Sequence, residues 1–553
     1  LSAPLKLQQE CTSKDANGTC TQVERKCGEY EPSTGFFADF DDSPGGTGVP
    51  GADVVIFVTA APTTLCLDTS GTVGYSVTCQ RDAETDRPLA GWLNLCQEDI
   101  LSSRTGRLRQ LYINALIHEM VHILGFSSEN FAFWRDAASD TYAPRTPRCG
   151  GFAPVGNGPN QCRFDELADM EGIPPYTDDT KTRHFVSSTT VKTFTERGSD
   201  PNAVSKIVTP EVARVAQDHY DCANVEGVEL ENFVSSVLGA GEAYSLAGSH
   251  FEKRLFYNEF MVAEQSTEAM DTPRSVFTLA VLKDSGWYDV VYANADQFLR
   301  GKGSKCTFAE EKCDISTSDW CRDATVEGQC SYDLSAVGDC AVVNYTSTLP
   351  AQYQYFPTAR EGGSDQMMDF CPAVLPYETG RCDQSDSSPP TWDLRECGNN
   401  PTDKRYSCKG MQFGSSSVCL ASTLWKDGDD LVKRSARFDK QAGCYHIRCV
   451  KDTEDDPTVS VQILLPNGDW HECDRAARAQ LLEEGFSYVG EIWCPSKPLD
   501  VCANRPVIVL SSRPPPVSRP SGSTPSMAAS QSRPTLLVLA GSFTVVVLSV
   551  WQL

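Results

Sequence analysis

The sequence predicts a chain of several domains in which helices and strands are mixed. Three observations carry this prediction. The β-branched run Val54–Thr59 is typical of a short buried strand. Residues 107–124 repeat apolar side chains at steps of three and four, which indicates a helix. From Cys306 to Cys502, cysteines separate short strand-like runs, as in a loop-rich region held by disulfides. The length of 553 residues also exceeds what one compact core usually organises.

Further elements follow in chain order. Gly125 directly follows the first predicted helix and is a helix-stop signal. Helical patches recur at Pro210–Tyr220 and at residues 277–286, the latter ending at Gly286. Residues 458–466, inside the cysteine-rich region, favour a strand.

The composition excludes one class of partner and favours one compartment. The formal net charge is −26, which argues against nucleic acid, because phosphates need a basic surface. The 24 cysteines show no recurring zinc-ribbon spacing, so we expect disulfides and an oxidising compartment. Two glycosylation sequons, at Asn17 and Asn344, agree with a secreted or cell-surface glycoprotein.

Both ends of the chain bear on its location. The sequence begins at Leu1 with no basic-then-apolar leader, so we expect that a signal segment is missing or has been removed. Residues 536–551 are apolar and uncharged, follow a Ser/Pro-rich stretch, and precede only Gln552 and Leu553. This arrangement favours a glycolipid-anchor signal over the alternative, a single transmembrane helix at the tail.

The stretch "ALIHEMVHILGF", residues 115–126, predicts a metal site. On a helix, His118 and His122 project from one face and can hold one ion. Glu119 lies one step round, where its carboxylate can take a proton from a metal-activated water and pass it to a leaving amine. The alternative is an apolar core helix. Two histidines and a glutamate would then each need a buried hydrogen-bond partner, and each one without a partner would cost a few kcal/mol. We therefore predict zinc.

A catalytic zinc needs a third protein ligand and an open fourth position. Gly125 permits the sharp turn that brings such a ligand from a loop. In the compact form of that motif the ligand is residue 128, which here is Ser128. The candidates are His184, His219, His250, His446 and His471. His446 and His471 lie inside the cysteine-rich region, where we expect surface or core residues, and spacing alone does not separate the other three. A glutamate ligand from a second helix also stays open.

The motif "HEMVHILGFS" resembles the active-site helix of the leishmanolysin family, surface metalloproteases of the metzincin clan. In that family the third histidine lies in a "GSH" segment and a methionine follows eleven residues later. Here "AGSHFEKRLFYNEFMVAE" contains His250 and Met261 at that spacing. The runs "MMDFCPAVLPYETGRC" (367–382), "DWHEC" (469–473) and "WCPSKPLDVC" (493–502) are also similar to the family, and the resemblance covers about residues 50–505.

The resemblance implies an α+β fold of metzincin type. N-terminal and central subdomains would flank the active-site cleft, with a larger insertion between Glu129 and about Pro201. It implies one zinc ion per chain, held by His118, His122 and His250, with Glu119 catalytic and with Gly125 and Met261 structural at the site. The expected segments are an N-terminal catalytic subdomain at 1–126, the insertion and central subdomain at 127–305, a Cys-rich domain at 306–505, a stalk at 506–535 and a hydrophobic anchor tail at 536–553.

The function implied is a membrane-anchored, cell-surface zinc endopeptidase that hydrolyses protein or peptide substrates. One alternative is a catalytically inactive surface adhesion or receptor protein on a protease scaffold. Retention of Glu119 argues against that alternative, because an inactive site would be free to lose it. A zinc hydrolase that acts on a non-peptide bond is a further alternative.

Overall fold

The computed structural model divides the chain into two compact units, Leu1–Arg381 with Val545–Leu553, and Cys382–Thr544. This division differs from the five segments expected from the sequence, which stay a prediction. The structure describes residues 4–14, 20–38, 45–67, 72–96, 106–136, 176–177, 183–184, 186–196, 202–232, 234–235, 244–245, 248–264, 272–317, 320–321, 328–383, 410–426, 441–455, 458–473, 479–482, 488–495, 498–502, 505–510 and 544–548.

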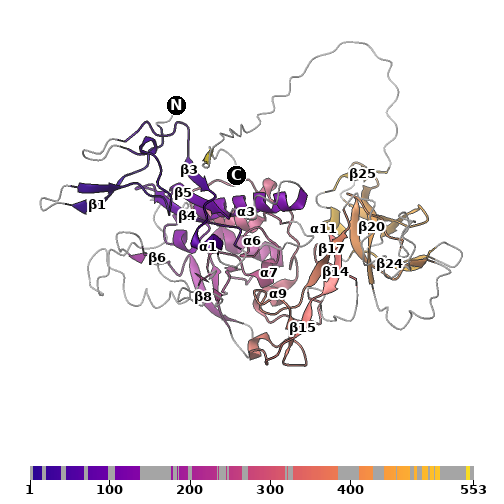
Figure 1. Ribbon diagram of the computed structural model, residues 1–553. Coiled ribbons are helices and arrows are strands. Elements are labelled where there is room, and N and C mark those ends of the chain that lie inside the picture. Colours follow the sequence, from indigo (N-terminus) through magenta and orange to yellow (C-terminus); the bar gives the residue numbers. More distant parts are fainter. Residues whose placement is uncertain are drawn as a thin grey trace, which may run out of the picture. The chain divides into compact units, whose positions relative to one another are not determined.

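The central sheet of the first unit has the strand order β26-β3-β5-β4 (Figure 1). Strands β3 (Val54–Thr59) and β5 (Pro88–Leu95) are parallel, with Val55 opposite Ala90. Strand β4 (Gly74–Arg81) runs antiparallel to β5. The strand predicted at Val54–Thr59 is confirmed.

Both faces of this sheet are buried, which explains why β3 is apolar without alternation. Side chains of a strand point alternately to opposite faces. Val54 and Ile56 belong to the large core cluster of the unit. Val55 and Phe57 pack in a second cluster on the opposite face, with Trp92 of β5. A strand covered on both sides reads as a continuous hydrophobic run.

Helix α3 (Gly106–Leu124) packs across β4 and β5 and confirms the helix predicted at 107–124. Ile123 lies against Gly91 of β5, where an added Cβ would come within 2.4 Å of the isoleucine side chain. The helix ends in a closing turn in which Phe126 N–H donates to Val121 O at 3.1 Å and Gly125 N–H to His122 O at 3.2 Å. This is the hydrogen-bond pattern of a Schellman motif, and Gly125 has the positive φ of +149°.

Besides the central sheet, the first unit contains a three-stranded sheet and a pair of packed helices. Strands β8 (Val191–Glu196), β9 (Asn202–Ile207) and β10 (Val228–Glu229) form a small sheet. Helices α6 (Pro210–Tyr220) and α8 (Val276–Asp284) confirm the two predicted helical patches, and the structure packs them together. Asp284 fixes this pair, because its carboxylate accepts hydrogen bonds from the first amides of α6, Glu211 N at 2.8 Å and Val212 N at 3.0 Å.

The other α-helices and strands in the described part of the first unit are mostly short. Its helices are α1 (Thr64–Leu67), α4 (Ser128–Phe131), α7 (Lys253–Phe256) and α9 (Lys305–Glu310). Its strands are β1 (Glu10–Lys14), β2 (Cys20–Glu24), β6 (Tyr176–Thr177), β7 (Arg183–His184), β11 (Val234–Ser235), β12 (Tyr244–Ser245), β13 (Gln329–Cys330), β14 (Ala336–Cys340), β15 (Val342–Asn344), β16 (Glu361–Gly363), β17 (Val374–Arg381) and β26 (Thr544–Leu548).

The second unit is built on an eight-stranded sheet, and its described residues also form one short helix, α11 (Pro498–Cys502). Its strands are β18 (Ser417–Ser422), β19 (Trp425–Lys426), β20 (Gln441–Lys451), β21 (Ser460–Leu464), β22 (Trp470–Cys473), β23 (Ala479–Leu482), β24 (Tyr488–Trp493) and β25 (Val507–Val509). Strand β21 confirms the strand predicted at 458–466. Strand β25 lies in the segment predicted as stalk, but it pairs in parallel with β20 and so belongs to the sheet.

Disulfide bonds cross-link segments within both units, as the cysteine content predicts. None of the cysteines in the described part of the chain is free. The bonds include Cys27–Cys79, Cys66–Cys96, Cys222–Cys306, Cys313–Cys371, Cys321–Cys340, Cys382–Cys444, Cys449–Cys502 and Cys473–Cys494.

Several expectations fall on residues outside the described part. Among these are the sequon at Asn17, residues 137–175 of the expected insertion, and most of the tail, of which 544–548 form strand β26 beside β3. The second sequon residue, Asn344, is exposed at the end of β15. Within the described residues, no helix combines the length and the apolar character needed to cross a bilayer.

Candidate metal centre

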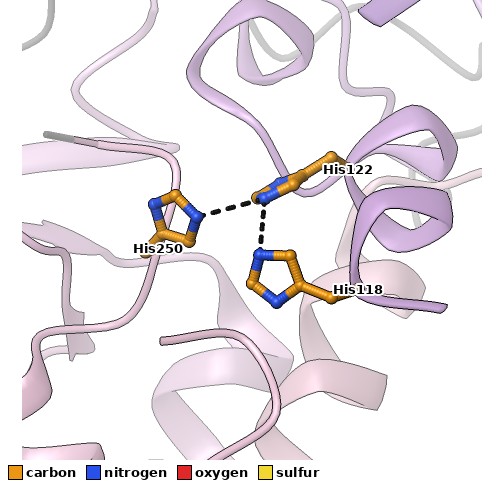
Figure 2. Close-up of side chains that lie close together, drawn as sticks. All are labelled: His118, His122 and His250. Carbon is orange, nitrogen blue, oxygen red and sulfur yellow. Dashed lines mark hydrogen bonds between the residues drawn. The ribbon is translucent and has the colours of Figure 1, made fainter. Parts of the chain in front are cut away.

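Two of the candidate ligands project from the last turns of α3. His118 and His122 lie four residues apart, so their rings stand one above the other on the same face of the helix. Figure 2 shows both rings pointing away from α3 toward a third ring, that of His250, which comes from a separate segment.

The segment that carries His250 is held by backbone pairing. Glu231 N–H donates to His250 O at 2.9 Å, and Gly248 N–H donates to Glu231 O at the same distance. Ser249 adds a direct link to the region after α3, because its Oγ accepts from Ser128 N at 3.1 Å. Although 128 residues separate His122 from His250, the loop therefore has a defined place beside the helix.

The three imidazoles meet through their Nε2 atoms. His122 Nε2 lies 2.9 Å from His118 Nε2 and 3.2 Å from His250 Nε2 (Figure 2). One ligand atom from each of the three residues lies within 4.8 Å of the others. Lone pairs that converge in this way can be shared by one ion.

The protonation of the rings shows why a cation fits at this point. His118 Nδ1 lies 2.7 Å from Phe260 O, and His122 Nδ1 lies 2.6 Å from Phe126 O. A carbonyl oxygen only accepts, so each Nδ1 carries the hydrogen, and in a neutral ring Nε2 is then an unprotonated acceptor. Two acceptor nitrogens 2.9 Å apart repel each other unless a positive charge lies between them.

Burial prevents a proton from supplying that charge near neutral pH. The side chains of His118 and His250 are 6% and 8% exposed, and His122 is partly buried. Desolvation lowers the pKa of His118 to about 3 and the pKa of His122 to about 4. Neutral imidazole nitrogens are the donors that zinc binds, at about 2.0–2.1 Å, so the donor set fits this ion.

Glu119 lies beside the triad and is held by an edge strand. Ser76 of β4 donates its hydroxyl to Glu119 Oε2 at 2.8 Å, and its Oγ also lies 2.9 Å from Glu119 O. Burial raises the pKa of Glu119 to about 7, and the hydrogen bond from Ser76 partly opposes this shift. The carboxyl is therefore poised to take up or release a proton near neutral pH.

Met261 lies in a turn that contacts both parts of the site. Its side chain is fully buried, and its carbonyl accepts from Phe251 N–H, the residue after His250, at 3.0 Å. The preceding residue, Phe260, provides the carbonyl that His118 bonds. The turn thus joins the helix histidines to the loop histidine.

The other candidate histidines have other positions. His219 is buried in α6, where its Nε2 bonds Arg300 O at 2.7 Å and its ring stacks on Phe298. His446 lies in the second unit, with Nδ1 2.7 Å from Ser416 Oγ. His184 and His471 lie in strands β7 and β22. Among the described residues, only His250 joins His118 and His122.

A second group of close acidic side chains, Glu229, Glu252 and Asp369, is explained without a metal. The buried guanidinium of Arg254 lies among them and pairs with Glu229 Oε2 at 3.1 Å. This arginine already supplies the positive charge.

Sequence reasoning missed the groups that orient the site. Ser76 and the carbonyl oxygens of Phe126 and Phe260 contact site side chains only through the tertiary fold. No local pattern marks them, because backbone acceptors carry no sequence signal and a single serine in a strand does not indicate a contact with a distant helix.

A helix that provides two imidazoles and a neighbouring glutamate, completed by a buried imidazole from a distant loop, defines a candidate transition-metal site of the metallopeptidase kind. The sequence model described as Leishmanolysin (Peptidase M8) matches residues 41–139 and 178–508, which is most of the chain. The protein belongs to the leishmanolysin family of metallopeptidases.

Curated relatives agree with this assignment. A leishmanolysin-like peptidase of Drosophila pseudoobscura pseudoobscura is 28% identical over 501 residues, covering 81% of this chain and 63% of the relative. Leishmanolysin of Leishmania tropica is 26% identical over 489 residues, covering 87% of this chain and 58% of the relative. The ciliated left-right organizer metallopeptidase of Danio rerio is 23% identical over 459 residues, covering 82% and 56%. The chain thus spans about three fifths of the length of these relatives.

Proposed function

We propose that the protein is a zinc-dependent endopeptidase that cleaves protein substrates, with one zinc ion per chain held by His118, His122 and His250. The observation that carries the proposal is the convergence of three Nε2 atoms, two from α3 and one from a loop 128 residues away. Membership in the leishmanolysin family supports the reaction class.

A bound zinc ion would polarise the scissile carbonyl and lower the pKa of a water molecule to near neutrality. The tautomers of His118 and His122 suit the binding of such an ion. The hydrogen bonds from His118 Nδ1 to Phe260 O and from His122 Nδ1 to Phe126 O fix both rings and leave Nε2 free of hydrogen. Such outer hydrogen bonds typically govern metal affinity by 10–100-fold.

Glu119 is the proposed general base. Its carboxylate takes a proton from the attacking water and gives it to the leaving amine. Ser76 holds Oε2 of this carboxylate at 2.8 Å, so the group enters the reaction already oriented. Met261 shapes the floor of the site as an apolar support and is not a ligand, whereas Gly125 allows the turn that ends α3.

We propose a metzincin-type arrangement for the first unit. The sheet β3-β5-β4 with α3 forms the N-terminal subdomain, and the segment with His250 and Met261 belongs to the central one. The support is the family resemblance, together with the pairing of Phe251 to Met261 in the turn below His118.

The proposed location is the cell surface. Extensive disulfides indicate an oxidising, extracellular environment. Asn344, exposed on β15, is a glycosylation candidate, and Asn17 is a second. Membrane attachment through a lipid on the C-terminal segment rests on the sequence of residues 536–553 alone. Release by a glycolipid-specific phospholipase tests it; a transmembrane tail would resist release.

A cleavage assay on purified full-length protein tests the function. We expect casein or gelatin to be cut, chelator to stop the reaction, zinc to restore it, and Glu119→Ala to be inactive with zinc still bound. Zinc binding without cleavage of any protein in a broad panel would favour the adhesion or receptor alternative. Turnover of esters or amides but no peptides would favour a different zinc hydrolase.

A further inference from the structure

The turn 259–262 touches both halves of the triad through its backbone. Phe260 O accepts from His118 Nδ1 at 2.7 Å. Met261 O accepts from Phe251 N–H at 3.0 Å, directly after His250. A displacement of this turn would therefore move the carbonyl that accepts the hydrogen bond of His118. It would also move the carbonyl that holds the backbone next to His250.

The carboxylate of Glu259 holds this turn from inside the protein. Its Oε2 accepts from Met261 N–H at 2.5 Å. Its Oε1 accepts from Ser275 N at 3.1 Å, Ser275 Oγ at 2.6 Å and Thr278 Oγ1 at 2.7 Å. The three donors on Oε1 belong to the N-cap and first turn of α8, so one side chain ties the turn to the start of a core helix.

This network is matched to an ionised carboxylate. Glu259 has no exposed surface. A carboxylate only accepts, and here four donors point at it, three at Oε1 and one at Oε2. The N-terminus of α8 adds the favourable end of the helix dipole. Burial raises the pKa of Glu259, and the hydrogen bonds from Ser275, Met261 and Thr278 oppose that shift.

We propose that Glu259 is a positioning residue of the metal centre. By bonding Met261 N–H on one side and the start of α8 on the other, its carboxylate sets the place of Phe260 O and Met261 O. Those oxygens in turn orient the ring of His118 and the strand segment that begins at His250. This inference rests on the proposed zinc site and adds a residue that contacts neither the ion nor the substrate.

The variant Glu259→Gln tests the inference with almost no change in volume. Its amide has one accepting oxygen, so the NH₂ group must face a donor, either Met261 N–H or the donors of α8. We expect zinc affinity to fall about 10–100-fold. The measurement is a titration of the metal-free full chain with zinc against a competing chromophoric chelator. The visible spectrum of the cobalt(II)-loaded protein should shift as well, because it reports the ligand geometry.

Asp284→Asn is the matched control. Asp284 is also a buried carboxylate of α8, 7% exposed, but it lies at the other end of that helix, where it caps α6. We expect this variant to lose thermal stability and to keep the zinc affinity and cobalt spectrum of the wild type. Equal loss of affinity in both variants would assign Glu259 a general structural role and overturn the inference.

Other outcomes are equally decisive. Zinc affinity of Glu259→Gln within threefold of the wild type would overturn the inference. If that variant does not fold, Thr278→Val removes one donor to Oε1 at constant shape, and an unchanged affinity and cobalt spectrum would overturn it. A comparison of wild type with His118→Ala tests the zinc site separately from the role of Glu259. Equal zinc affinity in these two proteins would contradict the proposed zinc site itself.

Discussion

His118 donates a hydrogen bond from Nδ1 to the carbonyl oxygen of Phe260, 142 residues later in the chain, at 2.7 Å. This contact joins the helix that carries two imidazoles to the turn that follows the third. It also fixes the tautomer of His118, so that Nε2 presents a lone pair to its neighbour His122. The fold thus holds the ring of His118 in the orientation that a metal ion would need.

Replacement of the loop histidine should separate metal binding from folding. We expect His250→Ala to weaken zinc binding at least 100-fold, since two protein nitrogens remain, while the unfolding transition stays cooperative. His219→Ala is the control, because His219 is a buried histidine bonded to Arg300 O at 2.7 Å. It should lose about 1–3 kcal/mol of stability and keep its zinc. Metal analysis and denaturant unfolding provide the check, and normal zinc content in His250→Ala would refute the ligand assignment.

Glu119→Gln should lower kcat by about 10²–10⁴-fold, the usual contribution of a general acid–base group. The amide oxygen can still accept from Ser76, so the position of the side chain and the zinc content should be retained. Steady-state kinetics on a fluorogenic peptide, with metal analysis of the same sample, make the measurement. Wild-type kcat in this variant would exclude Glu119 as the base.

Ser76→Ala should reduce kcat by about tenfold and leave KM nearly unchanged, because it frees the carboxylate of Glu119 to rotate without touching the metal ligands. Thr78→Val is a control on the same strand. Thr78 bonds Ile123 O at 3.1 Å, so its loss should cost about 0.5–1.5 kcal/mol of stability with little effect on kcat. Equal kcat values for the two variants would contradict a specific role for Ser76.

Gly125→Ala should destabilise the end of α3. Its φ is +149°, and an added Cβ would lie 3.1 Å from the ring of Trp287. We expect a loss of about 1–3 kcal/mol. Weaker zinc binding should accompany it, because the next residue, Phe126, accepts from His122 Nδ1. Gly51→Ala is the control, because Gly51 also has a positive φ but an added Cβ would meet no atom within 4 Å. This variant should lose less stability than Gly125→Ala and keep its zinc binding. Denaturant midpoints and zinc titrations measure both, and unchanged zinc affinity in Gly125→Ala would contradict the coupling.

Much of the fold around the site is predictable from local patterns. The strand Val54–Thr59 and the helix α3 emerge from runs of apolar residues with clear periods, and Gly125 marks the end of the helix. Cysteine content predicts disulfides but no pairing, because pairing depends on which loops meet in the fold. No feature of the sequence marks the division of the chain after Arg381. The clearest change in the sequence, the start of closely spaced cysteines, comes earlier, near Cys306.

The site was predictable only in part for the same reason. Spacing on one helix places His118 and His122 together, whereas it does not choose the third ligand among His184, His219 and His250. The family resemblance, and not a physical rule, singled out His250, which the structure brings to the other two. Ser76 and Glu259 lie far in sequence from the motif at residues 118–122, and no local pattern marks either of them. Only their tertiary contacts indicate a role at the site.

X-ray absorption at the zinc edge of the purified full chain tests the central claim most directly. We predict one zinc per chain with three imidazole nitrogens at about 2.0–2.1 Å and one exchangeable oxygen ligand, and a weaker imidazole scattering contribution in His250→Ala. Sulfur ligands at about 2.3 Å, or an imidazole shell unchanged in His250→Ala, would contradict the account.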